Sequence, residues 1–396
     1  MSGFARGDYG ATDCEIMTPT STSATTLVQS FITESACAAE LFITAVPTAP
    51  ATAPNHAVAL CGAVNEALRA HDAWIVEERV FGTAGSLELL CAARSRSYGP
   101  RAGNVRPLRI DIARTPLSDF GGIQVHAVCK TPRPEEIKLE GTPIGRILRQ
   151  QDSSLVTLSA ISSLEAGPPH DQAYRCFEKA ESLLKQLGAD FFSVARTWWW
   201  LNDICGWYGE FNRARGEFFK ERGLIGKEGS KHRLPASTGI GMRPADEAAC
   251  ALDVVAILAP QDRTRCFGGA GNQRSAYDYG SAFSRAARTN TPGGETVFVS
   301  GTAAIDAKGA TCHVGNAAGQ IADTMDNVCA VLSDMKCRNE DVVHAIAYCK
   351  TPEVEQVWNS VRGKYGWPFI TVPADVCREE LLFEVEATAC PGVRHT

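Results

Sequence analysis

The sequence predicts an α/β (α+β) protein built from tandem units, each a mixed sheet with helices packed on one face. The first observation is an internal repeat, in which residues 172–219 match residues 320–367 at a constant offset. The second is the shared order of elements, because an amphipathic helix, a polar turn, a strand and a second helix follow in each copy. The third is composition: 44% of the 396 residues are apolar and 21% are charged, a globular balance.

The first helix of the repeat carries the same apolar stripe in both copies, at the spacing of one helix face. Upstream, residues 158–165 match residues 299–306, and both are apolar strands that run into a small-residue turn. A closing strand follows in each copy, at residues 250–258 and 381–389. The order strand, helix, strand, helix, strand makes a mixed sheet with helices on one side. The stripe consists of Phe177, Ala180, Leu183, Leu184 and Leu187 in one copy and Met325, Val328, Val331, Leu332 and Met335 in the other.

The N-terminal third carries a weaker version of the pattern. It predicts a helix over residues 55–71 and strands over residues 73–81 and 122–128. These elements fit either a third, degraded copy or a separate structure, and the pattern leaves both open. We expect a partly disordered tail over residues 1–50, a candidate degenerate unit over 51–150, a diverged unit over 151–287 and a C-terminal unit over 295–396.

The bulk properties argue against several classes of protein. A net charge of -6 and a pI of about 5.8 disfavour nucleic-acid binding, which needs a basic surface. No apolar run approaches the roughly 20 residues of a membrane helix, and residues 1–23 lack the pattern of a secretory signal. The 15 cysteines never form a CxxC pair, so we expect reduced thiols, no metal site and a cytoplasmic protein.

The C-terminal unit contains VFVSGTAAID at residues 297–306, a helix from Gln320, and the ending LLFEVEATA at residues 381–389. These segments resemble the RidA/YjgF family, which implies tandem RidA/YjgF-like units. Members are typically trimeric imine deaminases with sites between subunits, and they bind the substrate carboxylate through an arginine after a Pro-Ala pair. Here the pair is followed by Asp375, which would repel a carboxylate. This departure argues against imine deaminase activity.

A longer series of motifs runs from Leu155 to the C-terminus and includes Arg196-Thr197-Trp198, Trp207-Tyr208, Phe211-Asn212, Arg213, Arg215, LPASTGIG at 234–241, YGSAFSRA at 279–286 and SGTAAID at 300–306. This series resembles the chorismatases. Those are monomeric enzymes whose fold is similar to a RidA-type trimer built within one chain, so the resemblance implies a pseudo-trimer-like arrangement. They cleave the enolpyruvyl ether of chorismate and release pyruvate with either 3-hydroxybenzoate or a dihydroxycyclohexadienoate.

Chorismate carries two carboxylates and an acid-labile enol ether, so its cleavage needs a proton donor and cationic clamps. Glu384 and Glu386 share one face of the closing strand because side chains alternate along a strand. Two neighbouring carboxylates raise the pKa of at least one of them. The resemblance implies that Glu384 is the proton donor, and we expect Asp253 to be its counterpart in the preceding copy. The alternative is that both glutamates are solvated on an edge strand.

Cys377 lies seven residues before Glu384. In the enzymes that the sequence resembles, a cysteine at this spacing belongs to the branch that forms 3-hydroxybenzoate, and an aliphatic residue belongs to the hydrolytic branch. A thiol there could assist rearrangement of an epoxide-like intermediate. The alternative is one more buried structural cysteine.

Arginines are the candidates for carboxylate clamps, because a guanidinium holds a carboxylate through two parallel bonds. Arg285 is the first choice. Arg213 and Arg215 lie two apart on a helix and point in different directions, so one of them is expected to be a surface charge. Tyrosines could hydrogen-bond the substrate, and small-residue loops let backbone amides approach an anion. The substrate-binding candidates are Arg285, Arg196, Arg215, Tyr208, Tyr279, Ser300 and Gly301, and a second small-residue loop lies at residues 237–239.

We therefore expect a monomeric chorismatase that forms pyruvate and 3-hydroxybenzoate, binds chorismate as its small-molecule partner, and needs no metal or organic cofactor. It is expected to bind neither nucleic acid nor membrane. One alternative is a chorismate hydrolase that gives 3,4-dihydroxycyclohexa-1,5-dienoate and pyruvate. Another is a non-catalytic RidA-like protein that binds a metabolite or a partner.

Overall fold

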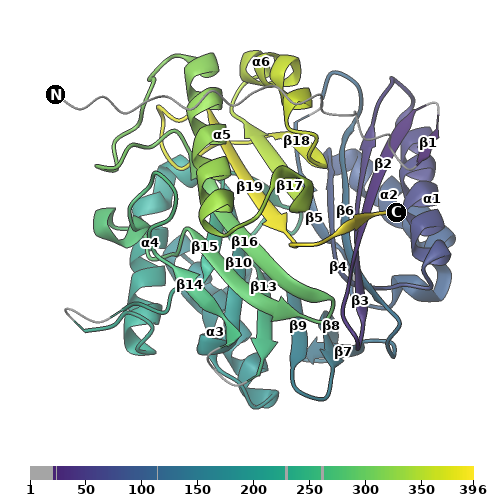
Figure 1. Ribbon diagram of the computed structural model, residues 1–396, viewed down its shortest axis with the longest axis horizontal. Coiled ribbons are helices and arrows are strands. Elements are labelled where there is room, and N and C mark those ends of the chain that lie inside the picture. Colours follow the sequence, from purple (N-terminus) through teal and green to yellow (C-terminus); the bar gives the residue numbers. More distant parts are fainter. Residues whose placement is uncertain (1–20, 24, 114, 228–230, 260–262) are drawn as a thin grey trace.

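The computed structural model describes residues 21–23, 25–113, 115–227, 231–259 and 263–396. In this part of the chain the strands form three mixed sheets that follow one another along the sequence. Figure 1 shows the helices at the periphery and the sheets meeting at the centre. Each sheet with its helices is called a unit, and the first, second and third units span residues 21–129, 135–258 and 265–389.

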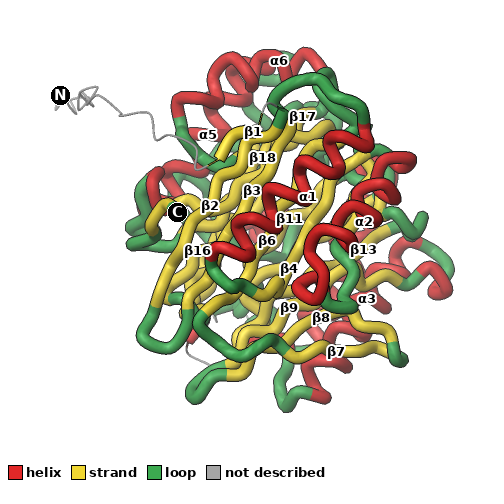
Figure 2. Tube along the Cα trace, turned by 90° about the vertical axis from the view of Figure 1, so that its right-hand side faces the viewer, coloured by secondary structure: helices red, strands yellow, loops and turns green. Residues whose placement is uncertain are grey.

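The first unit comprises β1 (Ser21–Ser23), β2 (Thr26–Glu34), β3 (Ala39–Pro47), α1 (Ala53–Ala70), β4 (Trp74–Gly82), α2 (Ala84–Tyr98), β5 (Leu108–Asp111) and β6 (Phe120–Cys129). Figure 2 shows α1 and α2 lying across one face of this sheet. Every residue of β6 is buried, because helices cover one face of the sheet and the other units cover the opposite face. The two polar residues of β6 have partners: Gln124 donates to the carbonyl of Ala345 in the third unit, and His126 hydrogen-bonds Glu40.

The second unit comprises β7 (Glu135–Leu139), β8 (Thr142–Arg149), β9 (Ser154–Ser162), α3 (Pro169–Gln186), β10 (Val194–Leu201), α4 (Ile204–Glu221), β11 (Ala236–Ile240), β12 (Arg243–Pro244) and β13 (Cys250–Leu258). The short strand β12 leaves this unit and pairs with β5 of the first. The first helix of the repeat, α3, buries the expected stripe, from Phe177 to Leu184, against its own sheet.

The third unit comprises β14 (Arg265–Phe267), β15 (Ala286–Thr291), β16 (Gly294–Ala303), α5 (Ala317–Asp334), β17 (Val342–Cys349), α6 (Pro352–Val361), β18 (Phe369–Pro373) and β19 (Phe383–Ala389), followed by β20 (Arg394–His395). Both helices begin at side-chain caps: Asn316 accepts from the amide of Gly319, and Thr351 accepts from that of Val354. The last strand, β20, pairs with β2 of the first unit and so joins the two ends of the described chain.

All three sheets have the same connectivity. Their orders are β1-β2-β3-β6-β4-β5, β7-β8-β9-β13-β10-β11 and β14-β15-β16-β19-β17-β18. In each unit the strand after the first helix pairs in parallel with the strand after the second, and the remaining pairs of these orders are antiparallel. The prediction of tandem units with mixed sheets and helices on one face is confirmed, and the N-terminal third has the topology of the other two units.

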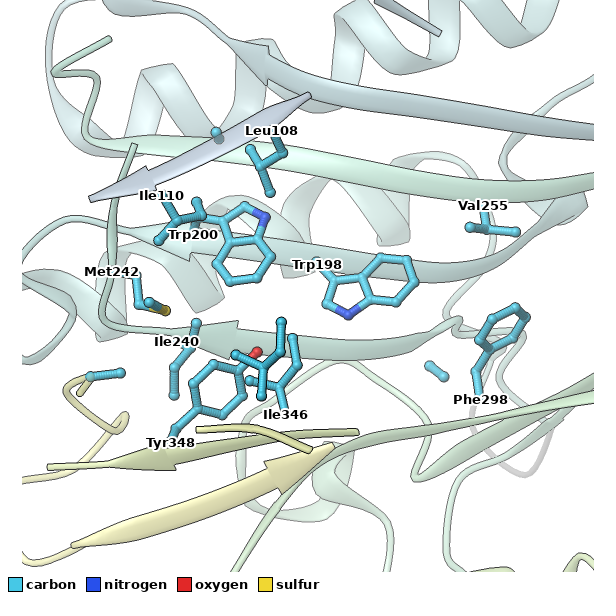
Figure 3. Packing of buried hydrophobic residues seen from close by; sticks show 14 of the residues in the cluster. Leu108, Ile110, Trp198, Trp200, Ile240, Met242, Val255, Phe298, Ile346 and Tyr348 are labelled. Carbon is cyan, nitrogen blue, oxygen red and sulfur yellow. The ribbon is translucent and has the colours of Figure 1, made fainter. Parts of the chain in front are cut away.

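The units close on one another in a ring. The parallel edge strand of each unit packs against the next unit: β11 against β16, β18 against β3 and β6, and β5 against β9. The inner faces of the sheets share one apolar core, which Figure 3 shows with Leu108 from the first unit, Trp198 and Trp200 from the second, and Ile346 and Tyr348 from the third. This is a pseudo-trimer-like arrangement within one chain.

Two expected domain boundaries are wrong. β7 and β8 belong to the second sheet, because β8 pairs with β9, so the second unit begins at Glu135 and not at residue 151. β14 and β15 pair with β16, so the third unit begins at Arg265 and not at residue 295. In both cases the first two strands of the unit precede the segment in which the two copies resemble each other in sequence.

The expected tail over residues 1–50 is also wrong for much of its length. β2 and β3 occupy positions in the first sheet, and most of their residues are buried. β3 pairs with β6, the most deeply covered strand of that sheet. Residues 1–20 lie outside the described residues.

Candidate active site

Two carboxylates of β19, Glu384 and Glu386, lie where the second and third units meet. β19 runs between β16 and β17, and both glutamates are buried, with Glu384 only 5% exposed. Burial and the neighbouring Glu386 raise the pKa of Glu384 to about 8, against the opposing effect of the Arg285 and Arg196 guanidiniums. Glu384 is therefore mainly protonated at neutral pH. The alternative of two solvated glutamates on an edge strand is wrong.

Glu386 connects the two units. Its Oε2 accepts from Nη2 of Arg196 at 2.7 Å, and its Oε1 accepts from Nε1 of Trp198 at 2.8 Å. Both donors lie on β10 of the second unit. The other terminal nitrogen of Arg196, Nη1, has no hydrogen-bond partner among the described residues. A buried guanidinium with an unused donor is suited to an anionic ligand.

The backbone at Ser300 and Gly301 forms an irregularity in β16, between its pairs Val299 and Thr302 with β19. The bulge brings the main chain directly against the carboxyl of Glu384. A Cβ placed on Gly301 would lie 2.1 Å from Oε1 of Glu384. The glycine is needed here because of this close approach and not because of its backbone conformation.

Gly301→Ala is expected to lower turnover by about 100-fold, because the new methyl group displaces the Glu384 carboxyl and a small misplacement of a reacting group is that costly. Steady-state kinetics with chorismate, the substrate that the sequence resemblance implies, measure the effect. Gly62→Ala is the matched control, since Gly62 lies in α1 and a Cβ there meets nothing within 4 Å. Unchanged turnover in Gly301→Ala would show that the carboxyl is not held where the reaction occurs.

Hydroxyl groups join β11 to the third unit beside these carboxylates. The hydroxyl of Thr238 accepts from the amide of Gly301 at 2.9 Å and from Arg196 at 2.5 Å. The hydroxyl of Ser300 accepts from the amide of Ser237 at 2.8 Å and donates to the carbonyl of Ser284. The hydroxyl hydrogen of Ser300 is therefore already used, and this residue holds the two units in register.

Arg215, Tyr208 and Cys377 form one wall of the site. The guanidinium of Arg215 lies 4.9 Å from the ring centre of Phe211 and 5.4 Å from that of Phe283, and its Nε has no hydrogen-bond partner within the described ranges. Tyr208 on the same helix lies close to Arg215 and Cys377. Burial raises the pKa of Tyr208 and of Cys377 to about 12 each, so both are neutral at physiological pH.

Arg285 lies close to the same group, because its guanidinium, like that of Arg215, lies 5.4 Å from the ring centre of Phe283. It is buried, its Nη2 donates to the hydroxyl of Tyr279, and its Nε donates to the carbonyl of Arg274 at 3.2 Å. Arg378, next to Cys377, lies 5.7 Å from the ring centre of Tyr279 and donates to the carbonyl of Gly309 at 2.9 Å. Arg285 has no ion pair among the described residues, so its charge is left to a ligand.

The structure gathers all the site residues predicted from the sequence around one junction of the second and third units. Arg213 is exposed, so of the two arginines on α4 it is the surface charge. Sequence reasoning missed Arg378 and the hydroxyl of Thr238. The position of Arg378 beside Cys377 was the available signal, whereas the role of Thr238 depends on a contact between distant segments.

The expected counterpart of Glu384 in the second unit is wrong. Glu386 is paired with Ile346 and Asp253 with Trp198, and these partners occupy equivalent positions on β17 and β10. Asp253 is therefore the counterpart of Glu386. Glu384 corresponds to Ala251, because Tyr348 and Trp200 are the equivalent partners. The closing strand of the third unit begins at Phe383, two residues after the expected residue 381, whereas β13 begins at Cys250 as expected, and this difference shifts the match by two residues.

Among the described residues, no group of three or more histidine, cysteine, aspartate or glutamate side chains is arranged to hold a metal ion. None of the helices in this part of the chain is both long and apolar enough to cross a membrane.

Residues 275–390 match the family model described as Endoribonuclease L-PSP. This match covers most of the third unit. Among solved structures, a chorismatase aligns over 71% of this chain and 86% of its own, with 21% identity and a TM-score of 0.53. The yeast protein YEO7 and the Rid-family protein YyfA from Yersinia pestis each align over 32% of this chain and 98% of their own, with 18% and 19% identity and a TM-score of 0.28. No curated protein matches the sequence.

These comparisons confirm the resemblance that the sequence indicates. The family match covers the C-terminal unit, and the likeness to the chorismatase extends over most of the chain and shows a common fold.

Proposed function

We propose that this protein cleaves the enolpyruvyl ether of chorismate, with Glu384 as the proton donor. The observation that carries this proposal is a buried carboxyl with a raised pKa and arginines of two units beside it. Glu384 keeps its proton at neutral pH, and Arg196 and Arg285 act on it from two different units. An enol ether is cleaved by protonation of its terminal methylene carbon, which needs an acid that is still protonated at the working pH.

In the proposed reaction the proton of Glu384 adds to the methylene carbon of the enolpyruvyl group and leaves an oxocarbenium ion. In the hydrolytic branch water adds to that cation, and the adduct breaks into pyruvate and the dihydroxycyclohexadienoate. In the other branch the ring hydroxyl attacks the ring carbon that carries the ether, so the bond between that carbon and the ether oxygen breaks, pyruvate leaves and the hydroxyl proton returns to Glu384. The epoxide-like intermediate that remains is an isomer of 3-hydroxybenzoate. It opens, loses a ring hydrogen as a proton and takes up a proton on oxygen, which makes the ring aromatic. The first branch consumes one water molecule and the second consumes none.

The two carboxylates of chorismate would be held by Arg215 and Arg285, which both lie beside Phe283. Both guanidiniums are buried, and neither forms an ion pair with a carboxylate of the described chain. A buried unpaired cation is costly to maintain, and a dianionic ligand removes this cost. Tyr208 and Tyr279 contact these arginines and orient them.

We propose 3-hydroxybenzoate as the aromatic product, because Cys377 lies beside Glu384 and Tyr208 in the site. Cys377→Ala is expected to shift the product toward the dihydroxycyclohexadienoate, since water gains the space of the thiol. The ratio of the two products, resolved by liquid chromatography, measures the shift. Cys37→Ala is the control, because Cys37 is an exposed cysteine of the first unit. An unchanged product ratio in Cys377→Ala would remove the thiol from the mechanism.

Incubation of the purified protein with chorismate tests the proposal. Pyruvate with 3-hydroxybenzoate supports the 3-hydroxybenzoate branch, and pyruvate with the dienoate supports the hydrolytic branch. Release of neither product would leave a protein that binds a metabolite without converting it. Imine deaminase activity is disfavoured because Asp375 is exposed and bridges Gly241 through its main chain, so it provides no cation for a carboxylate.

A further inference from the structure

Glu386 is a buried carboxylate that the proposed reaction does not use directly. Both of its oxygens accept hydrogen bonds, from Arg196 at 2.7 Å and from Trp198 at 2.8 Å. The salt bridge with the guanidinium fixes the position of this carboxylate. Glu386 lies two residues from Glu384 on the same face of β19, so its charge acts on the proton donor at short range.

The second unit has a carboxylate at the position of Glu386 but no acid at the position of Glu384. Asp253 stands at the position of Glu386, and Ala251 stands at the position of Glu384. A carboxylate at this position therefore joins neighbouring units by itself, and only the third unit places another acid two residues away. Asp253 accepts hydrogen bonds from the amide of Ala160 at 2.7 Å, from Arg79 at 3.4 Å and from Trp200 at 3.2 Å.

We propose that Glu386 is a positioning residue whose fixed negative charge keeps the proton on Glu384 and so sets the upper pH limit of catalysis. This inference rests on the proposed function, because it takes Glu384 as the proton donor. The repulsion between two carboxylates on one strand face opposes ionisation of the one that lacks a cationic partner. Glu386 has Arg196 as its direct partner, whereas Glu384 forms no ion pair within the described chain.

Charged and titratable groups face Glu384 from every neighbouring element. Arg196 on β10 and Arg285 before β15 favour its ionised form, and burial and Glu386 oppose them. Of the groups that act on Glu384 in the described chain, Glu386 is therefore the one anion. Three further titratable groups lie near Glu384: Tyr348 of β17, Tyr208 of α4 and Cys377. Each has a raised pKa and is therefore neutral at physiological pH.

The test compares Glu386→Gln with the wild type in two measurements. The first is the pH dependence of kcat/KM for pyruvate release, whose basic limb in the wild type is expected near the pKa of Glu384, about 8. The second is a carboxyl-carbon NMR titration of protein labelled with ¹³C-glutamate, without substrate, with the Glu384 signal assigned from Glu384→Gln. In Glu386→Gln, the basic limb and the NMR midpoint are expected to move to lower pH by about one unit or more.

Asp253→Asn is the matched control, because it weakens the same kind of connection in a unit with no second acid. Its basic limb and Glu384 midpoint are expected to stay at the wild-type values. A midpoint that does not move in Glu386→Gln would overturn the proposal and leave Glu386 as a structural connection only. An equal shift in Asp253→Asn would also overturn the proposal. The effect would then come from weaker packing between the units and not from the charge of Glu386.

If Glu386→Gln does not fold, Glu386→Met is measured against the same criterion, since apolar replacements of buried charges are often tolerated. If the wild type releases no pyruvate from chorismate, the proposed function fails. The NMR midpoints measured without substrate then still decide whether Glu386 holds the proton on Glu384.

Discussion

Glu384→Gln is expected to slow pyruvate release from chorismate by about 10²- to 10⁴-fold, the contribution of a positioned general acid. Glutamine has the shape of the neutral acid but no proton to donate. Since the pKa of Glu384 is raised to about 8, wild-type activity is expected to hold at neutral pH and to fall as pH rises through that value. An enzyme-coupled pyruvate assay on both sides of this pH measures the rate and the pH limit.

The fold of Glu384→Gln is expected to be intact, and the pH dependence of stability provides the check. The folded protein keeps a proton on Glu384 that the unfolded chain loses above about 4.5, so folding stability falls as pH rises from about 4.5 to about 8. Glutamine does not ionise, so the variant does not lose stability in this way. Its Tm at pH near 8 is therefore expected to equal or exceed that of the wild type.

Glu380→Gln is the matched control for Glu384→Gln. Glu380 is exposed on the loop before β19, and the contact it makes with Gln320 uses its backbone carbonyl. Its substitution is expected to leave turnover unchanged. Turnover by Glu384→Gln at the wild-type rate would move the proton donor to another group.

Arg215→Gln and Arg285→Gln are each expected to lower kcat/KM for chorismate by roughly 10- to 150-fold, since a hydrogen bond to a charged group contributes about 1.5–3 kcal/mol. The loss is expected mainly in KM, because each guanidinium holds a carboxylate that does not react. Arg285→Lys is expected to recover little, because an ammonium keeps the charge but cannot form two parallel bonds. Steady-state kinetics over a range of chorismate concentrations separate KM from kcat.

Arg213→Gln is the matched control for the arginine substitutions. Arg213 lies two residues before Arg215 on α4 but is exposed, so its substitution removes one positive charge without touching the site. Its kinetic constants are expected to match those of the wild type. If Arg213→Gln lowers kcat/KM as much as Arg215→Gln does, the arginines act through net charge and do not bind the two carboxylates.

Local periodicity predicted several elements correctly. The stripes of α3 and α5 pack against their own sheets as the spacing indicates. The run Trp198–Trp200 alternates along β10: Trp198 and Trp200 lie in the central core, and Trp199 lies in the core beneath α3 and α4 with Phe177. Alternation along a strand is a property of the backbone, so it can be read from a short segment.

The hairpins that open each unit could not be placed in this way. β2 lies in a stretch rich in serine and threonine, and β7 carries exposed charges, so neither shows a strong apolar pattern. β3 does carry a mostly apolar run over residues 41–46, but a single short run does not reveal which strands it pairs with. Their place in a sheet depends on pairing with β6 and β9. The register that makes Asp253 the counterpart of Glu386 likewise depends on strand pairing, with Trp198 and Ile346 as the equivalent partners, which no spacing in the sequence reveals.

The sequence by itself determined that this protein repeats one α/β unit and carries two glutamates on one strand face, because both follow from side-chain periodicity. Only the tertiary structure decided which glutamate keeps its proton. Arg196 and Trp198, which bind Glu386, lie 190 and 188 positions away from it in the chain. Burial and the charges of such distant residues set a pKa, and both arise only when the second and third units pack together.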